Sequence, residues 1–201
     1  MRADVTQEAD IERLIAGCLK TWSRIDCLFN NAGGPAPRGG IESIPVDGFD
    51  AAMATLVRSV MLGMKHAAPV MVKQGAGSII NNGSVAAVRA GLSSSMIYSA
   101  AKAAVVHLSN CVAMQLGEHN VRVNALCPGG VATPLVLGAL GLGQESLAGI
   151  RGAMDKTQAI PRAGEALDIA RAAVWLACDD ADCVTGQALA VDGGEGTGVT
   201  W

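Results

Sequence analysis

The sequence of 201 residues is poor in aromatic side chains, which make up 3% of it and include a single tyrosine. It has no apolar run of the roughly 18 residues that a membrane-spanning helix needs, and its polar, acidic first ten residues are untypical of a signal peptide. The 15 lysines and arginines are scattered, and the net charge is −3. The sequence therefore predicts a cytoplasmic protein with no membrane span and no nucleic-acid partner.

Paired cysteine spacings are also absent. None of the six cysteines belongs to a CxxC pair, and no spacing of the kind found in metal fingers occurs,. Most of them have apolar neighbours in the sequence, where a free cysteine acts as a small hydrophobic residue. We predict no metal site and reduced cysteines in the core, namely Cys18, Cys27, Cys111, Cys127, Cys178 and Cys183.

What the chain does contain is an alternation of short apolar runs with longer helical patterns. The short runs end in Gly, Asn or Pro, as strands that lead into loops do, and they cover residues 26–34, 78–84, 121–130 and 187–194,. Helical patterns lie at residues 6–22, 47–74, 94–119 and 165–180. The alternation predicts one α/β domain over residues 1–201, with a parallel sheet covered by helices on both faces.

The only tyrosine, Tyr98, stands four residues before Lys102 in a predicted helix, so the phenol and the ammonium would be neighbours on one face,. Ser84 ends a predicted strand, at the sheet edge where parallel α/β proteins bind their ligands. A nearby ammonium favours the phenolate, which brings the tyrosine pKa towards the range of acid–base catalysis. Ser84, Tyr98 and Lys102 are therefore candidates for proton transfer.

Each of these features also has a purely structural interpretation. A tyrosine and a lysine four residues apart are commonly a core ring and a solvated amine, Ser84 could bond to a loop amide, and NNAG (residues 30–33) could be an Asn-rich turn,. The order of the motifs favours the functional interpretation, because NNAG, the serine, YxxxK and PGGVAT follow one another, each at a strand end or on the next helix.

With these motifs the sequence resembles the classical short-chain dehydrogenase/reductase family. The resemblance covers essentially the whole chain, through NNAG, Ser84, YSAAK (98–102), PGGVAT (128–133), VTG (184–186) and VDGG (191–194). It implies a Rossmann-like doubly wound parallel sheet in three α/β/α layers, and reversible hydride transfer between NAD(P) and a secondary alcohol or ketone. It also implies that Tyr98 is the acid/base, that Ser84 holds the substrate oxygen, and that Lys102 binds the nicotinamide ribose and lowers the tyrosine pKa.

The resemblance further implies a set of cofactor contacts. The Val131 backbone and Thr133 would fix the nicotinamide carboxamide, and the NNAG loop would line the cofactor. The family's adenine-contacting Asp-Val pair has a counterpart near the start of the chain. The expected cofactor-binding residues, beside Tyr98 and Lys102, are thus Asp4, Val5, Asn31, Ala32, Gly33, Val131 and Thr133.

Two departures from the family pattern bear on activity. Leu56 stands where these enzymes usually carry an asparagine that positions a water for proton relay. The family's first strands and its TGxxxGxG turn have no counterpart, which corresponds to roughly 50 to 60 residues. The resemblance therefore implies an N-terminally truncated Rossmann fold that keeps the nicotinamide side and binds the cofactor weakly. NAD is expected by default, and NADP stays open because the residue that selects between them is not in the sequence.

The sequence alone is compatible with three classes of function. The first is an NAD(P)-dependent oxidoreductase with impaired activity, the second a non-catalytic protein acting through oligomer or partner contacts, and the third a carbonyl-binding protein without a cofactor. The expected substrate is an apolar secondary alcohol or ketone, with a cyclic skeleton as one form. The residues expected to line its site are Val88, Met96, Leu135, Val136, Leu137, Leu140 and Leu142.

Two further expectations concern mobility and assembly. Residues 135–164 are glycine-rich, apolar and long, as a mobile substrate flap would be,. The helices predicted at residues 47–74 and 94–119 are apolar on more than one face, and the family pairs these helices between subunits. We therefore predict a homodimer or homotetramer.

Overall fold

A single parallel sheet organises the chain, whose computed structural model describes residues 1–140, 143, 146–155 and 158–197. Its strands pair in the order β1-β2-β3-β4. In the middle of the sheet, Leu28 lies beside Ile79, and Ile79 beside Val123. The four predicted strands are confirmed as β1 (Cys27–Asn30), β2 (Gly77–Asn82), β3 (Val121–Pro128) and β4 (Ala188–Val191).

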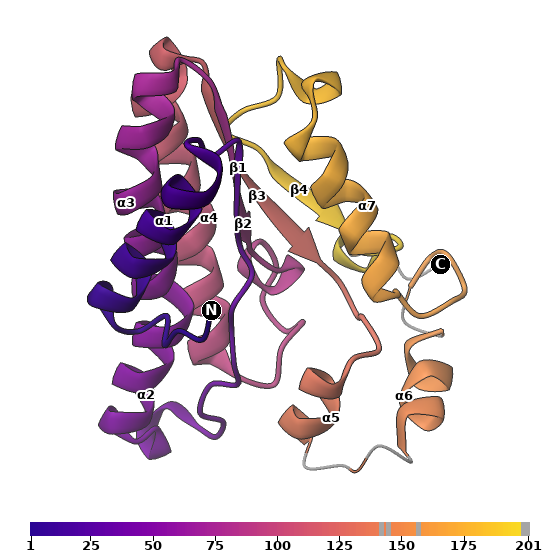
Figure 1. The fold of residues 1–201 in the computed structure, drawn as a ribbon. Helices are drawn as coiled ribbons and strands as arrows, with labels where there is room; N and C mark the ends of the chain where they lie inside the picture. Colours follow the sequence, from indigo (N-terminus) through magenta and orange to yellow (C-terminus); the bar gives the residue numbers. More distant parts are fainter. Residues whose placement is uncertain (141–142, 144–145, 156–157, 198–201) are drawn as a thin grey trace.

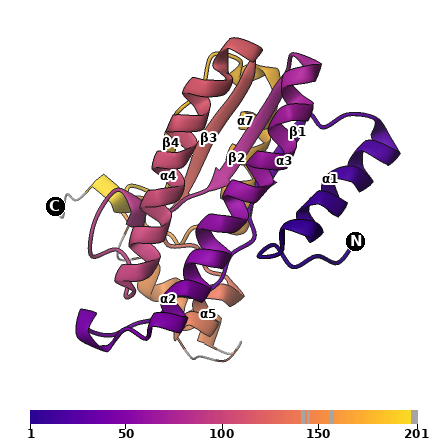
Figure 2. The ribbon, with the colours of Figure 1, turned by 90° about the vertical axis from the view of Figure 1, so that its left-hand side faces the viewer.

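Helices cover both faces of this sheet (Figures 1 and 2). One face carries α1 (Glu8–Trp22), α3 (Ser59–Gln74) and α4 (Met96–Leu116), and the other carries α7 (Ala166–Ala177). The predicted three-layer α/β/α arrangement is thereby confirmed. Short 3₁₀ turns complete the chain at η1 (Ile41–Ser43), η3 (Val85–Ala87), η4 (Gly117–His119), η6 (Asp179–Ala181) and η7 (Glu195–Thr197).

The helical region predicted at residues 47–74 is not uniform. It consists of α2 (Val46–Met53), a π-helical turn η2 (Ala54–Arg58) and α3. Such π turns widen a helix locally and occur often at functional sites. Leu56 lies in this turn, buried to 1% exposure, so the irregularity falls on the position that departs from the family pattern.

The core follows the two-residue period of the strands. Ile79 and Val123 point into the cluster beneath α3 and α4, whereas Ile80 and Leu126 point to the opposite face and pack with Leu176 of α7. In the central strands β2 and β3, successive residues are buried on opposite faces because both faces are covered there, which explains their continuous apolar runs,. In the outer strands β1 and β4, alternate residues are exposed.

The expectation of core cysteines is largely wrong. Cys127 is buried, but Cys27, Cys111, Cys178 and Cys183 are exposed and Cys18 is partly exposed; all six are free. Apolar neighbours in the sequence do not place a residue inside when it falls at a strand end or on the outer side of a helix. Within the described residues, no helix is both long and apolar enough to span a bilayer.

The segment predicted as a flap, residues 135–164, contains much of α5 (Pro134–Leu140) and all of α6 (Leu147–Met154). Both helices lie beyond the carboxyl ends of the strands, at the lower end of Figure 1. Leu137 is 1% exposed, so the start of the segment is packed against the domain. Residues 141–142, 144–145 and 156–157 of the predicted flap lie outside the described residues, and its mobility stays a prediction.

Candidate functional site

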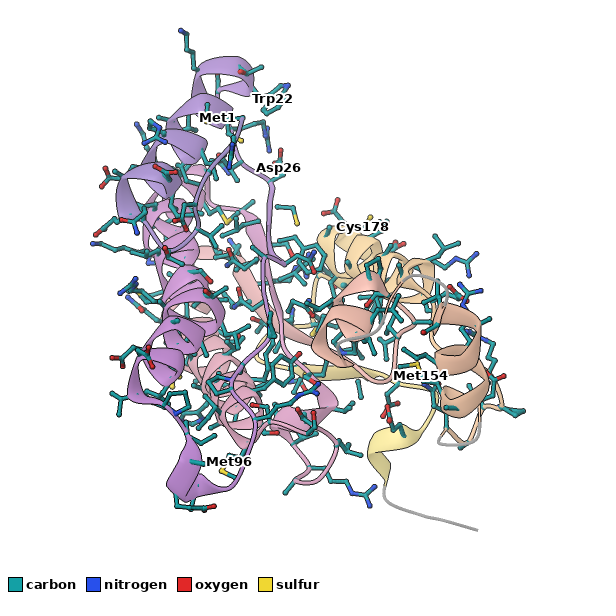
Figure 3. The ribbon with its side chains drawn as sticks, turned by 90° about the horizontal axis from the view of Figure 1, so that it is seen from below. Met1, Trp22, Asp26, Met96, Met154 and Cys178 are labelled. Atoms are coloured by element: carbon teal, nitrogen blue, oxygen red, sulfur yellow. The ribbon has the colours of Figure 1, made fainter. Side chains whose placement is uncertain are left out.

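A pocket of about 290 Å³ opens at the carboxyl ends of β2 and β3. Its walls come from segments far apart in the sequence, including the loop after β1, the start of α4, the PGGVAT loop and α6. Figure 3, seen from below, labels Met96 at the start of α4 and Met154 at the end of α6, on two sides of this region. Ser84 and Tyr98 both line the pocket, where parallel α/β folds place their ligands,.

Ser84 and Tyr98 are oriented by the local backbone. Ser84 follows β2 and caps the turn η3, its Oγ accepting a hydrogen bond from the Ala86 N–H at 3.1 Å. Tyr98 is in the first turn of α4, where its N–H donates to Oγ of the cap residue Ser95 at 3.1 Å. The Ser84 hydroxyl lies close enough to the Tyr98 phenol to lower the phenol pKa. The structure therefore brings the expected pair together in one pocket.

Lys102 lies one helical turn beyond Tyr98 and is buried, with 4% exposure. Its Nζ is 5.6 Å from the centre of the Tyr98 ring and donates to the Asn82 carbonyl at 2.6 Å. Burial penalises the ammonium and lowers the pKa of Lys102 to about 8, while the nearby Cys127 thiol opposes this shift. No carboxylate contributes to this balance, so the lysine is poised between its charged and neutral forms near physiological pH.

The tyrosine pKa does not follow the expectation from sequence. Burial raises the pKa of the Tyr98 phenol above its usual value, and the hydrogen bond from Ser84 opposes this only in part. Lys102 was expected to lower it, but it is absent from the groups that move this pKa, and its ammonium is itself destabilised by burial. In this ligand-free structure Tyr98 is thus a protonated acid at neutral pH.

The NNAG loop places Asn31, Ala32 and Gly33 at the end of β1, all solvent-exposed. Asn31 Oδ1 accepts a hydrogen bond from the Asn82 Nδ2 at 2.9 Å. The Asn82 Oδ1 is buried and has no hydrogen-bond partner among the described residues. An unpartnered acceptor beside an exposed polar loop fits a site completed by a polar ligand such as a dinucleotide.

The first residues of the chain lie beside the NNAG loop. Asp4, Val5 and Ala32 line one shallow hollow, together with Asp10. Asp4 accepts hydrogen bonds from the N–H and hydroxyl of Thr6, at 2.9 and 2.8 Å, and these lower the pKa of its carboxyl. The structure therefore brings Asp4 and Val5 together with the NNAG loop, at a different place from the pocket of Tyr98.

The PGGVAT loop is held by residues that the sequence did not single out. The Gly130 N–H donates to Glu195 Oε2 at 2.6 Å, and its carbonyl accepts from Gln158 Nε2 at 2.8 Å. Val131 lines the pocket and forms a parallel bridge with Gly164, whereas Thr133 begins α5 by accepting from the Val136 N–H at 3.1 Å. The VDGG motif just before Glu195 was the available signal, but it does not reveal which loop Glu195 would reach.

The predicted substrate-lining residues are only partly found in the pocket. Leu135 and Val136 line it, joined by Leu92 and Met154, which the sequence did not suggest. Val88 and Met96 are exposed outside it, and Leu137 is buried in the core. Nothing is described of the Leu140 side chain, and Leu142 lies outside the described residues.

Leu56 lies against the tyrosine helix. Its side chain belongs to a cluster with Ile97 and Ala101, and a β-carbon added at Gly33 would lie 3.6 Å from its Cδ2. An apolar side chain fills the position where the family carries its water-binding asparagine. The side chain of residue 56 therefore has no polar group to relay protons.

The sequence of the chain matches a known family model and known enzymes. A family model described as enoyl-(acyl carrier protein) reductase matches residues 1–195. The 2,5-dichloro-2,5-cyclohexadiene-1,4-diol dehydrogenase of Sphingobium indicum is 38% identical over 194 residues, which are 96% of this chain and 76% of the relative.

Two solved structures have a similar fold. The crystal structure of levodione reductase superimposes with a TM-score of 0.90 at 32% identity, covering 98% of this chain and 76% of that one. The structure of ElxO with NADP bound has a TM-score of 0.87 at 27% identity, covering 97% of this chain and 77% of that one.

Proposed function

Because the chain belongs to the short-chain dehydrogenase/reductase family, a family of oxidoreductases, we propose that it interconverts an apolar secondary alcohol and a ketone with NAD or NADP. The observation that carries this proposal is that Ser84 and Tyr98 line one pocket, with Lys102 buried beside the tyrosine ring. A cyclic substrate is supported by the Sphingobium relative, whose name specifies a cyclic diol.

The chain's own residues divide the chemistry among them. Ser84 is positioned to hold the substrate oxygen, and the protonated Tyr98 to donate a proton to a ketone oxygen. With its raised pKa, Tyr98 suits the reduction direction at neutral pH,. The apolar side chains of Leu92, Leu135 and Val136 line the pocket and would contact the substrate skeleton.

The dinucleotide, when bound, supplies or accepts the hydride. Lys102 would hold its nicotinamide ribose, and the Val131 backbone and Thr133 its carboxamide. On the other side, the Asn31–Gly33 loop with Asp4 and Val5 would hold the remainder. The hydrogen bonds of Glu195 and Gln158 to the Gly130 backbone support this assignment, because they fix the peptide that precedes Val131.

One feature supports reduced efficiency. The Leu56 side chain offers no polar atom for a relay, so proton exchange at Tyr98 would depend on a backbone group or on Lys102, whose Nζ donates to the Asn82 carbonyl at 2.6 Å. A non-catalytic role remains the second candidate, favoured by Leu56.

Turnover and cofactor binding test the proposal together. We expect slow oxidation of NADPH or NADH, followed at 340 nm, with a cyclic ketone as substrate, because the Leu56 side chain cannot relay protons. Calorimetric titration of each dinucleotide measures binding separately from turnover. A folded chain that neither binds nor oxidises either dinucleotide would favour the non-catalytic role.

We also propose that the chain forms a homodimer or homotetramer through α3 and α4. A groove between these helices is lined by apolar side chains that no described part of the chain covers, including Met61, Ala68, Val72, Leu108 and Val112. Figure 2 shows α3 and α4 side by side on the outside of the sheet, with α1 beside them. Exposed apolar helix faces of this kind mark protein interfaces.

The Ala68→Arg variant is expected to yield monomers, because the groove would have to bury an unpaired guanidinium. Light scattering at tens of micromolar measures the mass. Ala148→Arg is the matched control, since Ala148 is exposed on α6, and it should retain the wild-type mass. A monomeric wild-type chain would contradict the proposal.

A further inference from the structure

Two charged side chains are among the described residues that line the substrate pocket, which otherwise combines hydroxyl groups with apolar side chains. One is Glu195, whose carboxylate accepts the Gly130 N–H at 2.6 Å and is therefore engaged with the protein. The other is Arg38, on the loop after β1. Arg38 forms no hydrogen bond, ion pair or ring contact with a described residue, so a free guanidinium borders a cavity that is otherwise suited to an apolar ligand.

The position of Arg38 is fixed by the loop that carries it. The preceding residue, Pro37, has its carbonyl bound by the Ser95 hydroxyl at 2.5 Å. Ser95 is also the cap of α4 and accepts the Tyr98 N–H, so one side chain links the arginine loop to the turn that carries the tyrosine. Pro35 and Pro37 restrict the backbone on this side. The backbone next to Arg38 is thus linked to the helical turn that carries Tyr98, and Arg38 lines the same pocket.

Partial positive charge lies on the same pocket as Arg38, while the Glu195 carboxylate is engaged with the Gly130 N–H. The first turn of α4, a helix of 21 residues, borders the same pocket through Ser94 and Ser95. Unpaired N–H groups at a helix start carry partial positive charge. Arg89 donates to the Glu195 carbonyl at 3.3 Å rather than lining the pocket. The remaining walls, Leu92, Leu135 and Val136, suit a hydrocarbon skeleton.

We propose that Arg38 is a specificity-determining residue that binds a carboxylate group of the substrate, while the carbonyl or alcohol carbon lies at Ser84 and Tyr98. This inference rests on the proposed function and narrows its substrate class to small apolar keto acids or hydroxy acids, whose acid group is distant from the reacting carbon. The cavity of about 290 Å³ is at the small end of the range for small-molecule sites, which suits a single ring,.

A matched pair of ketones tests the inference. The probes are 4-oxocyclohexanecarboxylate and the neutral 4-methylcyclohexanone, which share the ring and the reacting carbonyl. The wild type should prefer the carboxylate in kcat/KM by about tenfold, equivalent to about 1.4 kcal/mol. Arg38→Gln should abolish this preference and leave the neutral ketone within about twofold, whereas Arg38→Lys should restore part of it. Added salt should weaken the preference in the wild type.

Arg89→Gln is the control for general electrostatics, because it removes a nearby guanidinium that does not line the pocket, and it should keep the preference. Equal kcat/KM for both ketones in the wild type would overturn the inference. So would an equal loss for both ketones in Arg38→Gln, which would indicate a role in loop structure alone.

A binding measurement separates this inference from the proposed reaction. Calorimetric titration of 4-oxocyclohexanecarboxylate into the folded wild type and Arg38→Gln needs no turnover. If the probe binds more tightly to the wild type although neither ketone is reduced, the proposed reaction fails and the anion site stands. If the wild type binds the carboxylate no more tightly than the variant does, the anion site is overturned.

Discussion

Replacing Tyr98 with phenylalanine is expected to lower kcat by a factor on the order of 10² to 10⁴, the usual worth of general acid–base catalysis. The substitution removes one oxygen and keeps the ring, which packs against the cluster of Leu56, Ile97 and Ala101. Loss of one partly buried hydroxyl changes the free energy of unfolding by no more than about 1 kcal/mol. The variant should therefore remain folded and nearly inactive.

Two measurements make this result specific. Ser99→Ala is the matched control, because Ser99 lies next in the helix, bonds back to the Ser95 carbonyl at 3.4 Å and does not line the pocket; it should keep wild-type kcat. Urea unfolding of both variants separates loss of chemistry from loss of fold. Turnover of Tyr98→Phe within tenfold of the wild type would refute the assignment of Tyr98 as the acid.

The strands and the proximity of Ser84, Tyr98 and Lys102 were predictable from sequence because their signals are local. Short apolar runs that end in Gly or Asn specify buried parallel strands, and the spacing of four between Tyr98 and Lys102 specifies one face of a helix. Ser84 could be added because strand ends of a parallel sheet meet at one edge. In each case a few neighbouring residues contain the information.

The pKa of Tyr98 could not be predicted in the same way. Sequence spacing gives the proximity of Lys102, which alone would lower the phenol pKa. The opposite direction results from desolvation, which depends on every segment packed around the ring,. The same burial acts on Lys102 and weakens the charge that was expected to act on its neighbour.

Residues that act through long-range contacts also escaped prediction. Glu195 lies 65 positions from Gly130, and Gln158 lies 28 positions from it, yet the two bind the backbone N–H and carbonyl of this one residue. Arg38 was missed because an isolated arginine in a loop has no periodicity to mark it. The misplaced cysteines show the converse error, since apolar sequence neighbours do not determine which side of an element a residue occupies.

Lys102 has the second large effect, and it concerns stability as well as activity. Its folded-state pKa of about 8 lies below the usual value of 10.5. A buried lysine with a lowered pKa destabilises the fold most at pH values below 8, where it is charged in both states. The penalty is relieved as pH rises from about 8 to about 10.5, because the folded protein then releases the proton before the unfolded chain does. At about 1.4 kcal/mol per pH unit, the whole penalty is about 3 kcal/mol.

Lys102→Met is therefore expected to be inactive yet no less stable than the wild type at pH 7.5. Methionine has a similar length and removes the buried charge, which stabilises the variant by about 3 kcal/mol. Against this, the Asn82 carbonyl loses the donor that contacts it at 2.6 Å, which costs about 1–3 kcal/mol,. The net change is between none and about 2 kcal/mol of added stability, in contrast to the loss usually caused by replacing a buried, hydrogen-bonded residue.

The pH dependence separates this explanation from simple repacking. Between pH 7.5 and 9.5 the wild type should gain about 1–2 kcal/mol of unfolding free energy relative to Lys102→Met, since only the wild type has this titrating group. The neighbouring Tyr98 and Cys127 titrate in both proteins, so their contributions largely cancel in the difference. Lys73→Met removes an exposed lysine of α3 and should give no such trend. Urea unfolding at pH 7.5 and 9.5 measures the unfolding free energy of each protein. If the difference between the wild type and Lys102→Met stays constant, or if the variant becomes relatively more stable as pH rises, the buried ammonium beside Tyr98 does not destabilise the fold.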